Sequence, residues 1–283
     1  MDNCNLDSYI LELLKYKVVN NNHHDGDLYE HSVWTAKCLE KWLKENNKWV
    51  KDIKLSKKLI ILSGLFHDIG KVGINTIYGN KKANYTYNFK HGHEDEGFKI
   101  MSGKKSINID ERINQFNKVL NKENLRKYLK KNCDITDLEY SVIAVAGAMH
   151  YELGNIMIQI EKENRNMRKT DAISYILKFL NFIKDKGLPY RFKLNNEYGL
   201  SINILRLCLA VSAADVKGSK PLLDDNNELY KSSNFYFMNS DKIKKSIPEN
   251  KNNGYYKYGY NTKGLRLAEN IIDIYKNNKN MFV

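Results

Sequence analysis

The stretch "LFHDIGKV" at residues 65–72 sets a histidine and an aspartate, His67 and Asp68, side by side at the end of an apolar run. The run before the pair reads as a buried helix, with Ser56 as its N-cap and Gly70 as a left-handed residue that ends it. Neighbouring helical residues project about 100° apart. His67 can therefore bind one ion while the two oxygens of Asp68 reach toward a second, so the pair predicts a metal site at a helix end.

Helical patterning dominates the rest of the chain. Asp27 is a good N-cap for a helix whose one face carries residues three or four positions apart: His31, Trp34, Cys38 and Trp42. Thr136 and Glu139 form a capping-box pattern ahead of another apolar run. Residues 73–97 are expected to form an irregular loop that carries histidines. The alternation of Tyr, Thr and Asn within this stretch also allows a small β-hairpin. We therefore expect an all-α helical bundle with long irregular loops.

Length and composition indicate a folded protein. The chain has 283 residues, of which 42% are hydrophobic and 11% aromatic, and these values are unlike those of a disordered chain. No repeat or linker is visible. One domain over 1–283 is the economical interpretation, with a motif core at about 25–220 and a C-terminal extension at 221–283.

The sequence points to a soluble cytoplasmic protein without a membrane segment. No apolar run looks long enough to cross a bilayer, and the N-terminus lacks the basic region and apolar stretch of a signal peptide. The cysteines have no paired spacing, so we expect reduced thiols that mostly fill core positions; they are Cys4, Cys38, Cys133 and Cys208.

The formal net charge of +13 is compatible with a polyanionic partner such as nucleic acid. The lysines that dominate it are spread widely rather than gathered in one stripe. Charge alone therefore does not decide between a nucleic-acid partner and a generally basic surface.

All seven histidines fall between positions 23 and 150, and several occupy inner-looking helical positions. His150 follows Gly147 at the spacing at which His67 follows Gly64. Asp215 ends a helix, where its charge meets the negative end of the helix dipole. Because a buried unpaired carboxylate is costly, Asp68 and Asp215 each require a cationic partner. A divalent ion would serve all of these groups, and mixed imidazole and carboxylate ligands suit Mn, Fe, Co, Ni or Zn, with Mg also allowed.

The motifs, taken in order, resemble the HD-domain metal-dependent phosphohydrolase superfamily, which is named after an adjacent His-Asp pair. The matching segments span about 25–220 and read "YEHSVWTA", "LFHDIGK", "FKHGHEDEGFKI" and "AADVKG". The resemblance implies a helical bundle with a first metal bound by His31, His67, Asp68 and Asp215. It implies a second metal bound by His93 and His150, with Asp68 as the bridge.

The chemistry implied by the resemblance is metal-dependent hydrolysis of a phosphate ester. The substrate would be a phosphodiester or phosphomonoester in a nucleotide, a cyclic nucleotide or a nucleic-acid end. Asp68 and Lys71 are the expected catalytic residues, and Glu94 or Asp95 would orient water or a ligand. The expected substrate-binding residues are Lys71, His91, Lys217 and Lys220.

Two other functions stay open at this stage. A non-catalytic nucleic-acid-binding module on an HD scaffold would keep the fold and the basic surface without turnover. An HD-fold oxygenase with a di-iron centre would use the same framework of His, His-Asp and Asp. The oligomeric state is not readable from the sequence.

Overall fold

The chain is all-α wherever the structure describes it, as the sequence predicted, and these residues include no strand. The β-hairpin that we allowed before residue 93 lies outside the described part. The computed structural model describes residues 6, 13–14, 28–71, 93–102, 125–185, 198–218 and 260–278.

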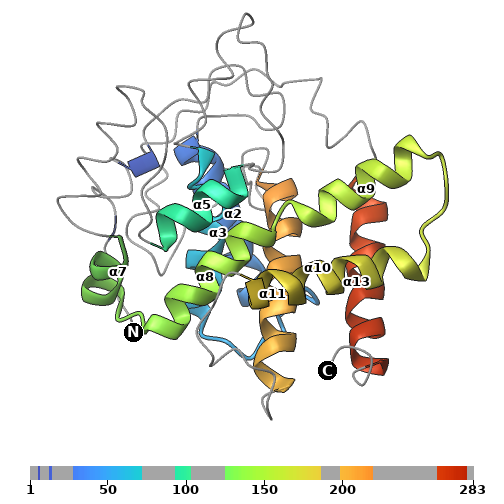
Figure 1. Cartoon of the computed structure of the whole chain (residues 1–283). Coiled ribbons are helices and arrows are strands. Elements are labelled where there is room, and N and C mark those ends of the chain that lie inside the picture. The colour runs from blue at the N-terminus through green and yellow to red at the C-terminus, as the bar shows by residue number, and fades with distance from the viewer. Residues whose placement is uncertain are drawn as a thin grey trace, which may run out of the picture.

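Four helices form the centre of the molecule: α2 (Leu28–Lys44), α3 (Lys57–Phe66), α8 (Asp137–Met149) and α11 (Tyr198–Lys217). Helix α3 packs against α2 and α8, and α11 contacts all three of the others. In Figure 1, α11 (orange) runs alongside α2, α3 and α8, between them and α13 (red). Segments far apart in the sequence therefore meet at the ends of α3, α8 and α11, where the predicted metal ligands are.

The remaining helices surround this centre. Helices α5 (His93–Met101) and α7 (Leu125–Cys133) both contact α8. Helices α9 (Glu152–Lys162), α10 (Lys169–Asp185) and α13 (Tyr260–Asn277) pack together on the other side of α11 in Figure 1. Buried side chains from the central helices and from α13 belong to one hydrophobic cluster.

Two predicted N-caps are confirmed. The Ser56 hydroxyl oxygen accepts a hydrogen bond from the Leu59 N–H at 3.2 Å and begins α3. At α8 the Thr136 hydroxyl accepts from the Glu139 N–H at 3.2 Å, and the Glu139 carboxylate accepts from the Thr136 N–H at 2.9 Å. This reciprocal pair is the capping box expected from the sequence. Asp27, the expected cap of α2, lies outside the described residues.

The expectation that Gly70 is left-handed is wrong. Helix α3 ends at Phe66, and His67 follows it in right-handed helical geometry with φ −57°. The chain continues as a tight turn, in which the Lys71 N–H donates to the Asp68 carbonyl at 2.9 Å, and Gly70 has no positive φ. Glycine is needed here for a different reason: its backbone lies directly against the first turn of α5.

One stretch of the described chain, Asp137–Ile160, has the length and hydropathy to cross a membrane, which the sequence analysis did not expect. Of its most apolar window, 72% is buried inside the protein. Packing in the core therefore accounts for its apolar character.

The cysteines only partly follow the prediction. Cys38 and Cys208 are free and buried, as expected of thiols in a core, and burial raises the pKa of the Cys38 thiol to about 12. Cys133 is disulfide-bonded, so the expectation of a reduced thiol is wrong there.

We expect Thr136→Ala to lower the free energy of unfolding by about 1 kcal/mol, because it removes the acceptor for the Glu139 N–H. Thr136→Ser keeps a hydroxyl and should retain most of that stability. Chemical denaturation of the three proteins measures both values. Equal stabilities for the alanine and serine variants would contradict a capping role.

Candidate metal centre

Four buried side chains converge at the meeting point of α2, α3 and α11, namely His31, His67, Asp68 and Asp215. We call them the first group. His31 Nε2 lies 3.0 Å from Asp215 Oδ1, 3.2 Å from Asp68 Oδ2 and 3.1 Å from His67 Nε2. His67 Nε2 lies 3.4 Å from each of the same two carboxylate oxygens. The first group is the ligand set that the sequence motifs implied for one metal.

A second group shares Asp68 and adds His93 from α5 and His150 from the end of α8. His93 Nε2 lies 3.1 Å from Asp68 Oδ1, and His150 Nε2 lies 3.4 Å from the same atom. The two imidazole nitrogens are 3.4 Å apart. The two oxygens of Asp68 thus face different groups, which is the bridging arrangement expected from the adjacent His-Asp pair.

Backbone carbonyls orient three of the imidazoles. His67 Nδ1 lies 2.6 Å from the Gly64 carbonyl oxygen, and His150 Nδ1 lies 2.5 Å from that of Gly147. His31 Nδ1 lies 2.9 Å from the carbonyl oxygen of Gly218. A carbonyl only accepts, so each Nδ1 carries the hydrogen and each Nε2 is directed at the centre. Such bonds hold ligand histidines in the tautomer and orientation that a metal requires.

The two aspartates stay ionised in the interior. Burial opposes ionisation of Asp68, but the Lys71 ammonium and the His67 imidazole hold the pKa of this carboxyl well below its usual range. Burial also opposes ionisation of Asp215, whose pKa is held well below its usual range by hydrogen bonds from His31 and His67. Burial would lower the pKa of His31 and of His67. The neighbouring Asp68 and Asp215 carboxylates outweigh burial and raise the pKa of both imidazoles. A metal would therefore take the place of protons on the imidazoles, as is usual for such sites.

The residues present fit a divalent ion. Two donors that each lie about 2.1 Å from one ion are about 3.0 Å apart at a right angle and about 3.4 Å apart at the tetrahedral angle. Each of the separations given above for the two groups, from 3.0 to 3.4 Å, falls in this interval. Asp68 Oδ1 is fully buried and has no hydrogen-bond partner among the residues that the structure describes, and a metal bound by the second group would satisfy it.

The exposed fractions of the side chains differ between the two groups. In the first group no side chain is more than 6% exposed, whereas the side chain of His93 is 19% exposed. Glu94 is also 19% exposed, with Oε1 3.5 Å from His93 Nε2. Lys71 is 18% exposed, and its Nζ lies 2.5 Å from Asp68 Oδ2. The partly exposed side chains at the centre are therefore His93 and Glu94 beside the second group and Lys71 beside Asp68.

The residues expected to bind substrate have different outcomes. Lys71 adjoins the first group. Lys217 is the exposed last residue of α11, and no ion pair joins it to either group. His91 and Lys220 lie outside the described residues.

Sequence reasoning missed parts of this centre. His93 was assigned to an irregular loop, but it is the first residue of α5. The carbonyls that orient His67 and His150 follow a Gly-x-x-His pattern, visible in "GLFH" at 64–67 and "GAMH" at 147–150, whose meaning becomes clear only in the structure. The Gly218 carbonyl has no comparable local signal. Tyr151, whose ring centroid lies 6.0 Å from that of His93, was also not singled out.

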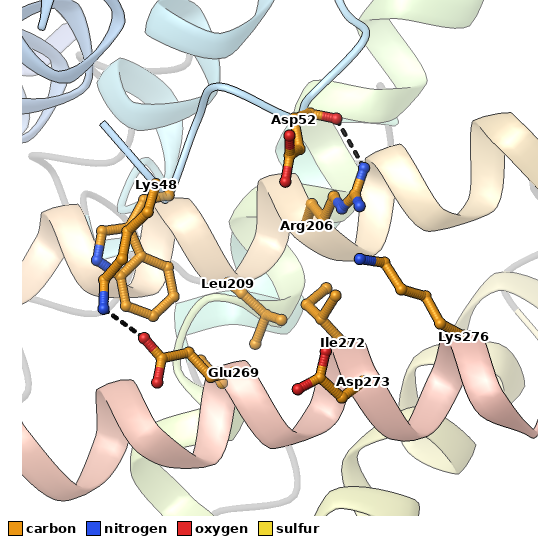
Figure 2. Close-up of a pocket in the computed structure, with 10 residues that line it drawn as sticks. Lys48, Asp52, Arg206, Leu209, Glu269, Ile272, Asp273 and Lys276 are labelled. Atoms are coloured by element: carbon orange, nitrogen blue, oxygen red, sulfur yellow. Dashed lines mark hydrogen bonds and ion pairs between the residues drawn. The ribbon is translucent and has the colours of Figure 1, made fainter. Parts of the chain in front are cut away.

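A pocket of about 290 Å³ lies elsewhere, between α11, α13 and the turn after α2 (Figure 2). Among its charged side chains, Lys48 pairs with Glu269, and Arg206 Nη1 donates to the Asp52 carbonyl at 2.7 Å. No member of either group lines it. The pocket is therefore separate from the metal centre.

Comparison with known proteins agrees with this geometry. The HD domain family matches residues 28–176, which include the members of both groups other than Asp215. Asp215 comes from α11, beyond the matched region. No curated protein and no solved structure matches the chain. The match covers more than half of the sequence, and the chain therefore belongs to the HD-domain superfamily of metal-dependent phosphohydrolases.

Proposed function

We propose that this protein is a two-metal phosphohydrolase that cleaves a phosphodiester in a nucleotide, a cyclic nucleotide or a nucleic-acid end. The observation that carries the proposal is the position of Asp68, with Oδ2 in the first group and Oδ1 in the second. A carboxylate that bridges two sets of imidazoles is suited to hold two ions close enough to act on the same substrate. In two-metal sites the ions stabilise both the attacking and the leaving oxygen of a displacement.

The proposed ligands are His31, His67, Asp68 and Asp215 for one ion, and Asp68, His93 and His150 for the other. Bound ions would supply hydroxide from water near neutral pH and would draw charge from the phosphoryl oxygens. Transition metals such as Mn, Fe, Co, Ni or Zn suit these nitrogen and oxygen donors, and Mg is also allowed.

Residues at the exposed side of the centre would bind the substrate. The flexible Lys71 side chain can turn from Asp68 to a phosphoryl oxygen and stabilise the charge that develops there. Glu94 adjoins the second group, where its carboxylate can accept a proton from attacking water. The half-buried Tyr151 ring adjoins His93 and His150 and forms a wall on this side.

Substitution of a ligand should show which of the two ions that ligand binds. We expect His67→Ala and Asp68→Ala to abolish phosphodiesterase activity and to weaken metal binding by more than about 100-fold, the upper end of the cost of losing an outer-shell partner. His150→Ala should lose one ion and keep the other. Metal analysis after dialysis and turnover of a generic phosphodiester with added Mn²⁺ measure these effects. Wild-type protein that binds no metal and gains no activity from it would refute the proposal.

Lys71→Met should lower turnover by about 100-fold, comparable to the removal of one charged or hydrogen-bonding stabiliser of a transition state. The metal content should be unchanged, because Lys71 is not a proposed ligand. Lys178→Met is the matched control, since it removes another paired lysine, on α10, and should leave kcat unchanged. An unchanged kcat in Lys71→Met would exclude a phosphate contact.

The substrate class can be tested with salt. If the net charge of +13 contributes to binding of an RNA or another oligonucleotide, the affinity for that ligand should fall about 10-fold or more between 50 and 200 mM salt. Several phosphate contacts require such a decrease. A mononucleotide should show a much smaller change. Affinity measured over this range for a short RNA and for a mononucleotide decides between the two.

The same measurements address the alternatives. Salt-dependent RNA binding without any turnover would favour a non-catalytic nucleic-acid-binding module. Iron in both groups together with oxygen-dependent turnover would favour a di-iron oxygenase. The complete set of donors in both groups supports a catalytic metal centre over the first alternative.

A further inference from the structure

Two glycine backbones touch where α5 meets the turn that carries Asp68. A Cβ atom built on Gly70 would lie 1.7 Å from the His93 carbonyl oxygen and 2.4 Å from the Gly97 nitrogen. A Cβ atom built on Gly97 would lie 3.3 Å from the Gly70 nitrogen. The first two contacts are impossible, and both are with backbone atoms that no side-chain rotation can move. The turn and α5 can therefore approach this closely only without a side chain at position 70.

This contact bears directly on the second group. His93, whose carbonyl oxygen meets Gly70, is the same residue whose Nε2 lies 3.1 Å from Asp68 Oδ1. Asp68 is two residues before Gly70. The glycine contact thus fixes the separation between the two elements that supply His93 and the bridging carboxylate.

We infer that Gly70 and Gly97 are positioning residues that set α5 against the Asp68 turn, so that binding of the second ion depends on their lack of side chains. This inference rests on the proposed two-metal function. The first group draws no ligand from α5, because its members come from α2, from the turn after α3 and from α11. The two ions should therefore respond differently to a change at the contact.

Burial indicates whether the Asp68 turn or the start of α5 would move if position 70 carried a side chain. His67 and Asp68 are 1% and 0% exposed, and the His67 backbone lies close to Gly147 of α8, where a Cβ would come within 3.3 Å of the His67 carbonyl oxygen. His93 and Glu94, at the start of α5, are partly exposed. A methyl group at position 70 would thus displace the start of α5 by about 1.7 Å or more, because it would begin 1.7 Å from the His93 carbonyl oxygen and ordinary van der Waals separation is about 3.4 Å. The first group would stay in place.

Gly70→Ala tests the inference in the full chain with Mn²⁺ as the probe. We expect its second-ion affinity to fall by at least about 10-fold, the lower end of the cost of losing an outer-shell partner, while the first-ion affinity changes by less than about 2-fold. Titration calorimetry measures both affinities. Electron paramagnetic resonance should change from the spectrum of a coupled Mn²⁺ pair to that of an isolated ion.

Two further variants make the result decisive. Gly97→Ala introduces a milder conflict at the same contact, so its second-ion affinity should fall in the same direction by less; it decides the question if Gly70→Ala does not fold. Ile271→Ala, in the core of α13, should lower the melting temperature without changing the Mn²⁺ stoichiometry.

The outcomes distinguish a failure of the positioning role from a failure of the proposed two-metal function. Folded Gly70→Ala protein that binds two ions with wild-type affinity, or that loses both together, overturns the positioning role. An unchanged second-ion affinity in Gly97→Ala overturns it when Gly70→Ala does not fold. Wild-type protein that binds fewer than two ions overturns the proposed two-metal function, and the positioning role falls with it.

Discussion

The buried carboxylate of Asp68 is the constraint on which the rest of the centre depends. It is 0% exposed and has imidazole nitrogens from four elements of the fold within 3.4 Å of its two oxygens. A carboxylate in such surroundings is costly unless cations approach it from both sides. Helices α2, α5 and α8 and the end of α3 therefore have to meet at one point, and the glycines in their contacts allow them to do so.

The orientation of the ligands is part of the helix geometry. In "GLFH" and "GAMH" a glycine three residues before the histidine supplies the carbonyl that receives the Nδ1 hydrogen. The absence of a side chain at Gly147 also lets α8 approach the His67 backbone. One residue thus serves two purposes, as hydrogen-bond acceptor and as close-contact point. The positions of His67 and His150 therefore depend on the packing of α3 against α8.

The resemblance to the HD superfamily implied the ligand set, because the motifs that carry these donors follow one another in the expected order, although each residue taken singly has an ordinary explanation. The structure brings the donors together in two groups. The all-α fold and the caps at Ser56 and Thr136 follow from local patterns. The expectation of a left-handed Gly70 was wrong because left-handed backbone geometry and a close backbone contact both favour glycine, and the sequence alone does not distinguish them. The start of α5 at His93, the Gly218 carbonyl and the disulfide at Cys133 depend on contacts between distant segments, which no local pattern encodes.

The long sequence separations within the first group link metal binding to folding. His31 in α2 donates to the Gly218 carbonyl, 187 residues away, and Asp215 joins the group from the same end of α11, beyond the matched HD region. The donors lie within reach of one ion only when α2, α3 and α11 are packed together. An ion bound there therefore stabilises the packed bundle over the unfolded chain. The second group includes α5, whose first residues are partly exposed, and it opens toward solvent. Under the proposed function, an ion in the buried first group would stabilise the fold, and the second group, with its more exposed His93, would face the substrate.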